Sequence, residues 1–267
     1  MFLAAHKKDI TALVTLSERG LFLARILSSE MGGKVFAHKD TGSEQAVELF
    51  DGIIDLTAAL FKRFKNIVYI APAGVAVRAI APYLKHKSFD PAVVAVDIGG
   101  RWAISLLSGH EGGANLLAFK ISNLLGCEPV VTTSTQAEKD IIAGLGCRKG
   151  AAAEDIVYAL NYALEKAACS LCRVRLLASA DIKKGEAGLI MAAEKLGIPL
   201  YFLSSEKIRN MPLRLSVSDF VQEQTGLPGV AEPCALIAGQ NTKLILGKTI
   251  CKSVTIALAR ENFLWSE

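Results

Sequence analysis

Short apolar runs alternate with segments of helical periodicity along this chain, and this alternation restricts the possible folds more than any other feature. The runs at residues 67–70 and 92–96 are apolar at every position. A strand with one face in water alternates apolar and polar residues, whereas a strand covered on both faces is apolar throughout, as in parallel sheets. Helices must therefore cover both faces, and the chain is predicted to be an α/β protein with short, mostly parallel sheets.

The pattern pauses once and then restarts. Residues 132–140 are short of apolar side chains, and the 267 residues are enough for two cores. We therefore predict two lobes of βα units, residues 1–137 and 138–267. Strands are predicted at residues 10–16, 67–70, 92–96, 102–107, 141–145, 174–178, 200–203, 243–246 and 253–259. Helices are predicted at residues 18–31, 74 to about 84, 114–125, around 156–164, and about 186–196.

Composition excludes several classes of protein. The net charge of +4 is mild, without the dense basic stripe of a nucleic-acid binder, and suits an anionic small molecule. The longest uncharged stretch, residues 66–77, is shorter than the ~20 residues of a membrane-spanning helix. Residues 1–9 lack the apolar core of a secretory signal. Six scattered cysteines favour a reducing cytoplasm, and the lone pair Cys169 and Cys172 has no second pair to complete a zinc site.

The segment at residues 108–115, Ser-Gly-His-Glu-Gly-Gly-Ala-Asn, joins a predicted strand to a predicted helix. Glycine lets the backbone approach a ligand closely, and free amides at a helix start attract anions. Because an unperturbed imidazole titrates near neutrality, His110 is a candidate general base, with Glu111 as its alternative or orienting partner. The amides of Gly112 and Gly113 are candidate oxyanion donors. A tight turn that only needs glycine would explain the same residues.

Charged residues follow other predicted strands. Arg78 falls early in a helix after a strand, where ligands of open α/β sheets bind, and could fork onto a carboxylate. The glycine-rich turn at 144–150 is neither a dinucleotide fingerprint nor a Walker loop, which disfavours a nucleotide-binding domain. Lys183 and Glu186 lie between a strand and a helix. Solvated surface charges remain the alternative for all of these.

Taken together, these segments resemble the cobalamin-biosynthesis CbiG family, the cobalt-precorrin-5A hydrolases. The match runs from about Gly52 onward. It is carried by residues 77–82 (Val-Arg-Ala-Ile-Ala-Pro), 90–94 (Asp-Pro-Ala-Val-Val), 106–115, 131–133, 144–150, Lys183 with Glu186, and 229–232 (Gly-Val-Ala-Glu). Family members often carry a middle segment between the lobes, of which only about residues 135–139 remain here.

The resemblance implies an enzyme of anaerobic vitamin B12 synthesis that opens the δ-lactone of cobalt-precorrin-5A and releases acetaldehyde. It implies no cofactor, because cobalt arrives inside the substrate. The predicted partner is an anionic corrinoid, without nucleic acid or membrane; a homodimer and transient contacts with neighbouring pathway enzymes are left open. A non-catalytic tetrapyrrole carrier is the alternative. Candidate catalytic residues are His110, Glu111 and Glu186, and candidate substrate-binding residues are Arg78, Gly112, Gly113, Asn115, Arg148, Lys183 and Glu232.

Overall fold

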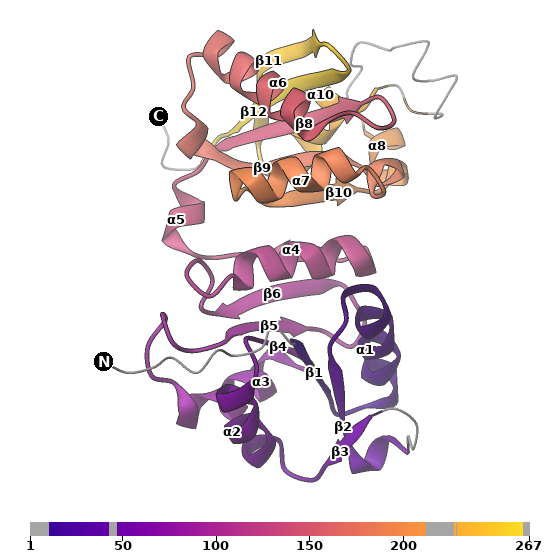
Figure 1. Cartoon of the computed structure of the whole chain (residues 1–267), viewed down its shortest axis with the longest axis vertical. Helices are drawn as coiled ribbons and strands as arrows, with labels where there is room; N and C mark the ends of the chain where they lie inside the picture. The colour runs from indigo at the N-terminus through magenta and orange to yellow at the C-terminus, as the bar shows by residue number, and fades with distance from the viewer. Residues whose placement is uncertain (1–10, 43–46, 212–226, 228, 264–267) are drawn as a thin grey trace. The chain divides into compact units, whose positions relative to one another are not determined.

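The computed structural model describes residues 11–42, 47–211, 227 and 229–263. The chain divides into two compact units, Met1–Thr133 and Ser134–Glu267. Each unit is built on its own sheet (Figure 1). We describe the units separately.

The first unit contains a seven-stranded sheet in the order β3-β2-β1-β4-β5-β6-β7. All neighbours are parallel except β5 and β6, which are antiparallel. The strands are β1 (Thr11–Thr15), β2 (Lys34–His38), β3 (Glu48–Phe50), β4 (Asn66–Ile70), β5 (Ala92–Val96), β6 (Trp102–Leu107) and β7 (Glu128–Val130).

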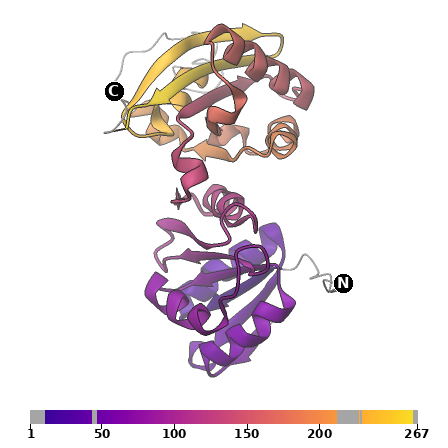
Figure 2. The ribbon, with the colours of Figure 1, turned by 90° about the vertical axis from the view of Figure 1, so that its left-hand side faces the viewer.

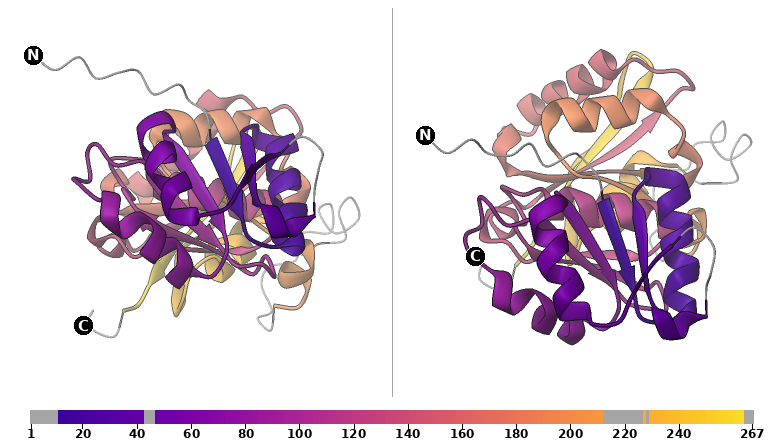
Figure 3. Two further views of the ribbon diagram at one scale, coloured as in Figure 1. Left: turned by 90° about the horizontal axis from the view of Figure 1, so that it is seen from below. Right: turned by 60° about the horizontal axis from the view of Figure 1, so that its bottom comes forward.

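Helices cover both faces of this sheet, as its fully apolar strands require. They are α1 (Glu18–Met31), α2 (Ile53–Arg63), α3 (Ala73–Ile80) and α4 (Ala114–Leu125). Alternate residues of β1 enter different cores: Leu13 packs with residues of α1 and α4, whereas Ala12 and Val14 pack with residues of α2 and α3. Figure 3 shows α1 and α2 on opposite sides of the strands. The sheet is therefore the middle layer of the unit, with helices packed on each of its faces.

Because β6 is antiparallel to β5, the strands of this sheet do not all end on the same side. We call the edge where β1, β4 and β5 end the carboxyl edge, and the opposite one the amino edge. Because β6 runs against β5 and β7 follows the direction of β6, both of these strands end at the amino edge. The turn after β6 therefore lies beside the residues that precede β5, and not beside those that follow β4.

The second unit has a five-stranded mixed sheet in the order β10-β9-β8-β12-β11. Strands β8 (Ile141–Cys147), β9 (Val174–Ala180) and β10 (Leu200–Leu203) are parallel, while β11 (Thr242–Cys251) and β12 (Val254–Glu261) form an antiparallel hairpin that pairs with β8 (Figure 2). Its helices are α5 (Ser134–Ala137), α6 (Ala153–Lys166), α7 (Ala187–Leu196), α8 (Ser205–Arg209) and α10 (Ala231–Ile237).

Glycine in β8 lets a helix pack directly on the strand. A Cβ on Gly144 would stand 1.9 Å from the carbonyl oxygen of Ala231 and 2.5 Å from the amide of Ala235, both in α10. Helices α6 and α7 contribute to a core with the other face of the sheet. Gly144 in the 144–150 motif thus has a structural reason, which is the close approach of α10.

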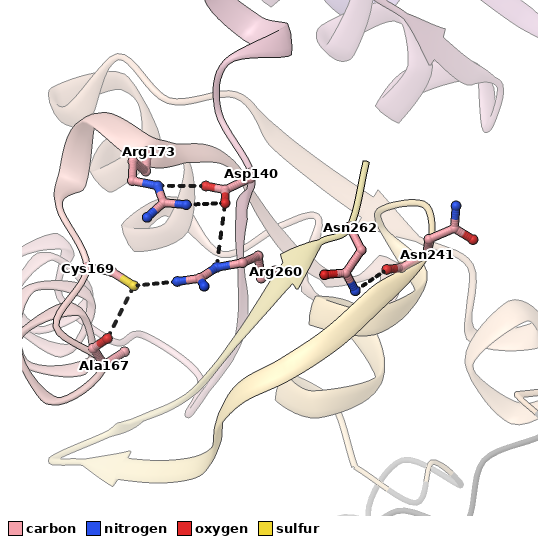
Figure 4. Close-up of polar contacts among 7 residues, drawn as sticks. All are labelled: Asp140, Ala167, Cys169, Arg173, Asn241, Arg260 and Asn262. Carbon is pink, nitrogen blue, oxygen red and sulfur yellow. Dashed lines mark hydrogen bonds and ion pairs between the residues drawn. The ribbon is translucent and has the colours of Figure 1, made fainter. Parts of the chain in front are cut away.

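An ion network ties the start of β8 to its neighbours (Figure 4). Asp140, 9% exposed, accepts from two guanidinium nitrogens of Arg173 and lies 3.5 Å from Nε of Arg260. Arg260 also lies 3.6 Å from Sγ of Cys169, whose thiol donates to the carbonyl of Ala167. Cys169 of the Cys-x-x-Cys pair is therefore integrated into the packing between α6 and β12.

The predicted α/β fold in two lobes is confirmed. The predicted helix at 18–31 is α1, and the predicted strands at 92–96 and 102–107 are β5 and β6. Residue 10 of the first predicted strand lies outside the described residues. The elements not predicted from the sequence are β2, β3, β7, α2, α5, α8 and α10. Within the described residues, no helix combines the length and apolar character needed to cross a membrane.

Candidate functional site

The turn after β6 is held by its own backbone. Ser108 has a φ of 55°, in the left-handed region that a serine rarely adopts, and it is 6% exposed. Its carbonyl turns back and accepts from the amides of Gly112 at 3.0 Å and Ala114 at 3.2 Å. A Cβ on Gly112 would stand 2.4 Å from that of Ser108. The strained serine therefore fixes the turn and requires glycine at position 112.

This geometry alters the expected oxyanion site. The amide of Gly112 is bonded to Ser108, and the amide of Asn115 donates to the carbonyl of Gly109 at 3.0 Å. Within the described part of the chain, no backbone acceptor takes the amide of Gly113, whose φ is 89°. The Gly112 amide already donates to the protein and is not available to an oxyanion. The Gly113 amide has no backbone acceptor among the described residues, so it stays the candidate oxyanion donor.

Asn115 lies inside the protein, although we expected it to contact substrate. Its side chain is buried, its Oδ1 accepts from Oγ of Ser105 at 2.9 Å, and its Nδ2 donates to Oγ1 of Thr133 at 3.0 Å. These bonds join β6, α4 and the segment after β7. Asn115 is therefore a brace that positions the turn, because its polar atoms already have partners within the protein.

His110 and Glu111 form the exposed tip of the turn. His110 is exposed and makes no hydrogen bond with another described residue, so a structural bond does not account for it. Glu111 pairs with Lys87 at 2.5 Å. The Lys87 ammonium holds the pKa of the Glu111 carboxyl below its usual range, so Glu111 is anionic near neutrality. A solvent-accessible imidazole thus stands next to a fixed carboxylate.

Arg78 does not join this turn. It lies in the last turn of α3, not early in the helix as we expected, and its guanidinium donates back to the carbonyl of Gly74 at 3.2 Å. Gly74 is the second residue of α3 and lies just after β4, at the carboxyl edge. The antiparallel β6 places His110 at the amino edge, opposite the carboxyl edge where Arg78 contacts the Gly74 carbonyl.

In the second unit, the predicted residues after β8 and β9 do assemble. Glu186 accepts from the amide of Gly150 at 2.9 Å and from Nζ of Lys183 at 3.2 Å. Both side chains are mostly buried, with 15% and 17% exposed. The Gly150 amide is the main reason that the pKa of Glu186 is lowered. Glu186 therefore joins the loop after β8 to the loop after β9, at the carboxyl ends of these parallel strands. Lys183 is already paired with Glu186.

Two predicted residues remain, one on the turn after β8 and one on α10. Arg148 is exposed on the turn that follows β8, where its charge is accessible to an anion. Glu232 is in the first turn of α10 and accepts from the amide of Lys248 at 2.8 Å, which ties α10 to β11. Among the described residues, no group of three histidine, cysteine or acidic side chains could hold a metal ion.

The sequence analysis missed two residues that shape the first-unit site. Lys87, the partner of Glu111, and Ser108, the strained residue, were not singled out. The signal for Lys87 was the connection between β5 and β6. Only residues 97–101 separate these strands, and parallel strands need a crossover of a dozen or more residues. An antiparallel β6 brings its carboxyl end back to the loop that contains Lys87.

The fold and these loops define a two-unit α/β protein with polar, ordered turns at its sheet edges. Two family models match it: Cobalamin synthesis G N-terminal over residues 55–136, and Cobalamin synthesis G C-terminus over residues 141–259. Protein CobE from a Sinorhizobium species is 33% identical over 136 residues, covering 50% of this chain and 88% of that protein. The chain belongs to the cobalamin synthesis G family.

Two longer relatives are similar along nearly the whole chain. The cobalt-precorrin-5A hydrolase of Priestia megaterium is 25% identical over 357 residues, covering 93% of this chain and 94% of the relative. The cobalt-precorrin-5A hydrolase of Salmonella typhimurium is 24% identical over 345 residues, covering 94% and 98%. Both alignments are longer than this chain of 267 residues, so each relative contains residues without a counterpart here.

Proposed function

We propose that this chain is a cobalt-precorrin-5A hydrolase of cobalamin biosynthesis. It opens the δ-lactone of the ring-contracted corrinoid with water and releases acetaldehyde to give cobalt-precorrin-5B. The observation that carries the proposal is similarity over nearly the full length to two proteins of that name. Matches to both family models, which together extend across both units, support it.

The reaction sets three demands on the protein. Water adds to the lactone carbonyl and the ring C–O bond breaks, which leaves a carboxylate and a hydroxyl on a two-carbon side chain. That hydroxyl then loses its proton as the carbon–carbon bond to the macrocycle breaks, and the two carbons leave as acetaldehyde. The conjugated macrocycle takes up the electron pair. A base, a donor for the oxyanion and cationic contacts for the substrate carboxylates are therefore needed.

The turn at 108–113 offers the first two. His110 is accessible, and in its neutral form it can take a proton from water or from the hydroxyl. Glu111 is anionic and adjacent, so it can orient the imidazole or act as the base itself. The Gly113 amide is the candidate oxyanion donor, since Gly112 donates to Ser108. In the second unit, exposed Arg148 is a candidate contact for substrate carboxylates.

We further propose that the enzyme acts in the cytoplasm without a cofactor of its own. Acid–base catalysis and the macrocycle supply what both bond cleavages require. Treating the purified protein with a chelator should therefore leave acetaldehyde release unchanged. Loss of activity that zinc restores would contradict this. Assembly as a homodimer and contacts with neighbouring enzymes remain proposals that sedimentation analysis can test.

The test of function is turnover. Purified protein is mixed with an excess of the lactone corrinoid, and acetaldehyde is measured with a coupled dehydrogenase. We expect many equivalents of acetaldehyde per protein and a corrinoid product that has lost two carbons. A carrier would bind the corrinoid tightly and release no acetaldehyde beyond the uncatalysed rate. That second result would replace the hydrolase with a tetrapyrrole carrier.

A further inference from the structure

The loop before β5 carries exposed aromatic and basic side chains beside the candidate active turn. We call residues 84–90 (Leu-Lys-His-Lys-Ser-Phe-Asp) the recognition loop. It lies at the amino edge, where β6 also ends. Oγ of Ser108 donates to the carbonyl of Asp90 at 3.1 Å, and Lys87 pairs with Glu111. The loop is therefore joined to the turn that contains His110 by two contacts.

The recognition loop is ordered from within. The carboxylate of Asp90 accepts from the amide of Lys85 through both oxygens, at 3.2 and 3.0 Å. The amides of Phe89 and Asp90 both donate to the carbonyl of His86 at 2.9 Å. The Ser88 amide donates to Nδ1 of His86 at 3.3 Å. These bonds close the loop on itself while its side chains from 84 to 89 stay exposed.

Phe89 is the most exposed large apolar side chain among the described residues, with 75% of its surface accessible. Single exposed apolar residues are common in soluble proteins and need no explanation alone. Here the ring is held by an ordered loop, lies 5.9 Å from the tilted ring of His86, and shares this loop with the exposed Lys85 and Lys87. An exposed aromatic ring in a loop that also carries two ammonium groups matches a flat conjugated ligand with anionic substituents.

We propose that the recognition loop binds the corrinoid: Phe89 packs against the face of the macrocycle, and Lys85 and Lys87 hold its carboxylates. This inference rests on the proposed function, which supplies the corrinoid. Packing against an aromatic ring stabilises a bound conjugated ligand beyond the effect of the buried area. The Lys87–Glu111 pair is solvated, with 65% and 39% of the side chains exposed, so exchanging one carboxylate for another costs little. When substrate takes Lys87, Glu111 is released beside His110.

The test compares Phe89→Ala with a matched control, Phe22→Ala. Phe22 is also exposed, at 65%, but lies in α1, which begins at the opposite edge of the same sheet. Binding of the lactone corrinoid to the full chain is followed by the change in its absorbance, and turnover by acetaldehyde. We expect Phe89→Ala to raise Kd and KM about tenfold, equal to about 1.4 kcal/mol. Its kcat and melting temperature should stay near those of the parent.

The control should leave Kd and KM unchanged. Lys87→Gln should weaken binding at low salt and make it less dependent on ionic strength, because an exposed ion contact is lost. Parental Kd in both recognition-loop variants would overturn the proposal. If the parent protein binds the corrinoid but releases no acetaldehyde, the hydrolase function fails while the effect of Phe89→Ala on Kd still decides this inference. A parent protein that does not bind the corrinoid overturns both.

Discussion

Replacing Asn115 by alanine tests whether this residue is a brace or a ligand contact. The change removes two hydrogen bonds and leaves the hydroxyls of Ser105 and Thr133 without their partner. A buried polar group left unsatisfied costs about 1–3 kcal/mol. Ser105 and Thr133 are only partly buried, so each hydroxyl should cost an amount in the lower half of this range, and we expect a loss of about 2–4 kcal/mol in total. In a unit of this size, that lowers the melting temperature by roughly 6–16 °C.

The assay is thermal and urea unfolding, followed by circular dichroism. The urea midpoint should fall while the m-value stays constant, since little surface is added on unfolding. Ser105→Ala removes one of the two bonds and leaves Oδ1 of the buried Asn115 without this donor, so it should cost about 1–3 kcal/mol. The double variant should lose less than the sum of both, because the two residues contact each other. Parental stability with a raised KM for Asn115→Ala would refute the brace and restore the residue to substrate binding.

Three further changes test other parts of the structure. His110→Ala should lower kcat about 10²–10⁴-fold with little change in melting temperature, and parental turnover would transfer the role of base to Glu111. Gly144→Ala should cost at least ~3 kcal/mol in unfolding free energy, because its Cβ would meet the Ala231 carbonyl, whereas Gly185→Ala meets nothing within 4 Å and should be nearly neutral. Burial raises the pKa of Tyr69 to about 12 from 10.0, so stability present below pH 10 should fall by up to about 2.7 kcal/mol by pH 12. Tyr69→Phe should flatten that part of the curve of unfolding free energy against pH, and an unchanged slope would assign it to other groups.

Much of the fold could be predicted because strands that are buried on both faces have apolar residues at consecutive positions. β5 is apolar at every position, and its predicted and observed bounds agree. Strands β2 and β3 escaped prediction for the same physical reason: β2 begins with Lys34 and ends with His38, and β3 has three residues, so neither shows a long continuous apolar run. The pairing of β12 with β8 joins segments that are distant in sequence, which periodicity does not specify.

The residue types of the candidate site could be predicted from the sequence, but the hydrogen bonds and contacts among these residues could not. Glycines at 109, 112 and 113 indicated a tight turn, and the structure has one, with left-handed backbone at Gly113 and no room for a Cβ at Gly112. Which amide is free depends on the left-handed φ of Ser108, and no local pattern predicts that a serine adopts it. Arg78 was grouped with His110 because both follow strands. The direction of β6 separates them, and the short 97–101 connection was the available signal.

The backbone of the turn after β6 has a consequence for local opening of the fold. Most helices begin with several amides bonded only to water, and these exchange their hydrogens with solvent quickly. At the start of α4, the amides of Ala114 and Asn115 are bonded to the carbonyls of Ser108 and Gly109. At the start of α3, the amides of Ala73 and Gly74 have no acceptor among the described residues. Deuterium should therefore enter the first turn of α3 long before it enters that of α4, so the two helix starts of one sheet differ in how readily they open.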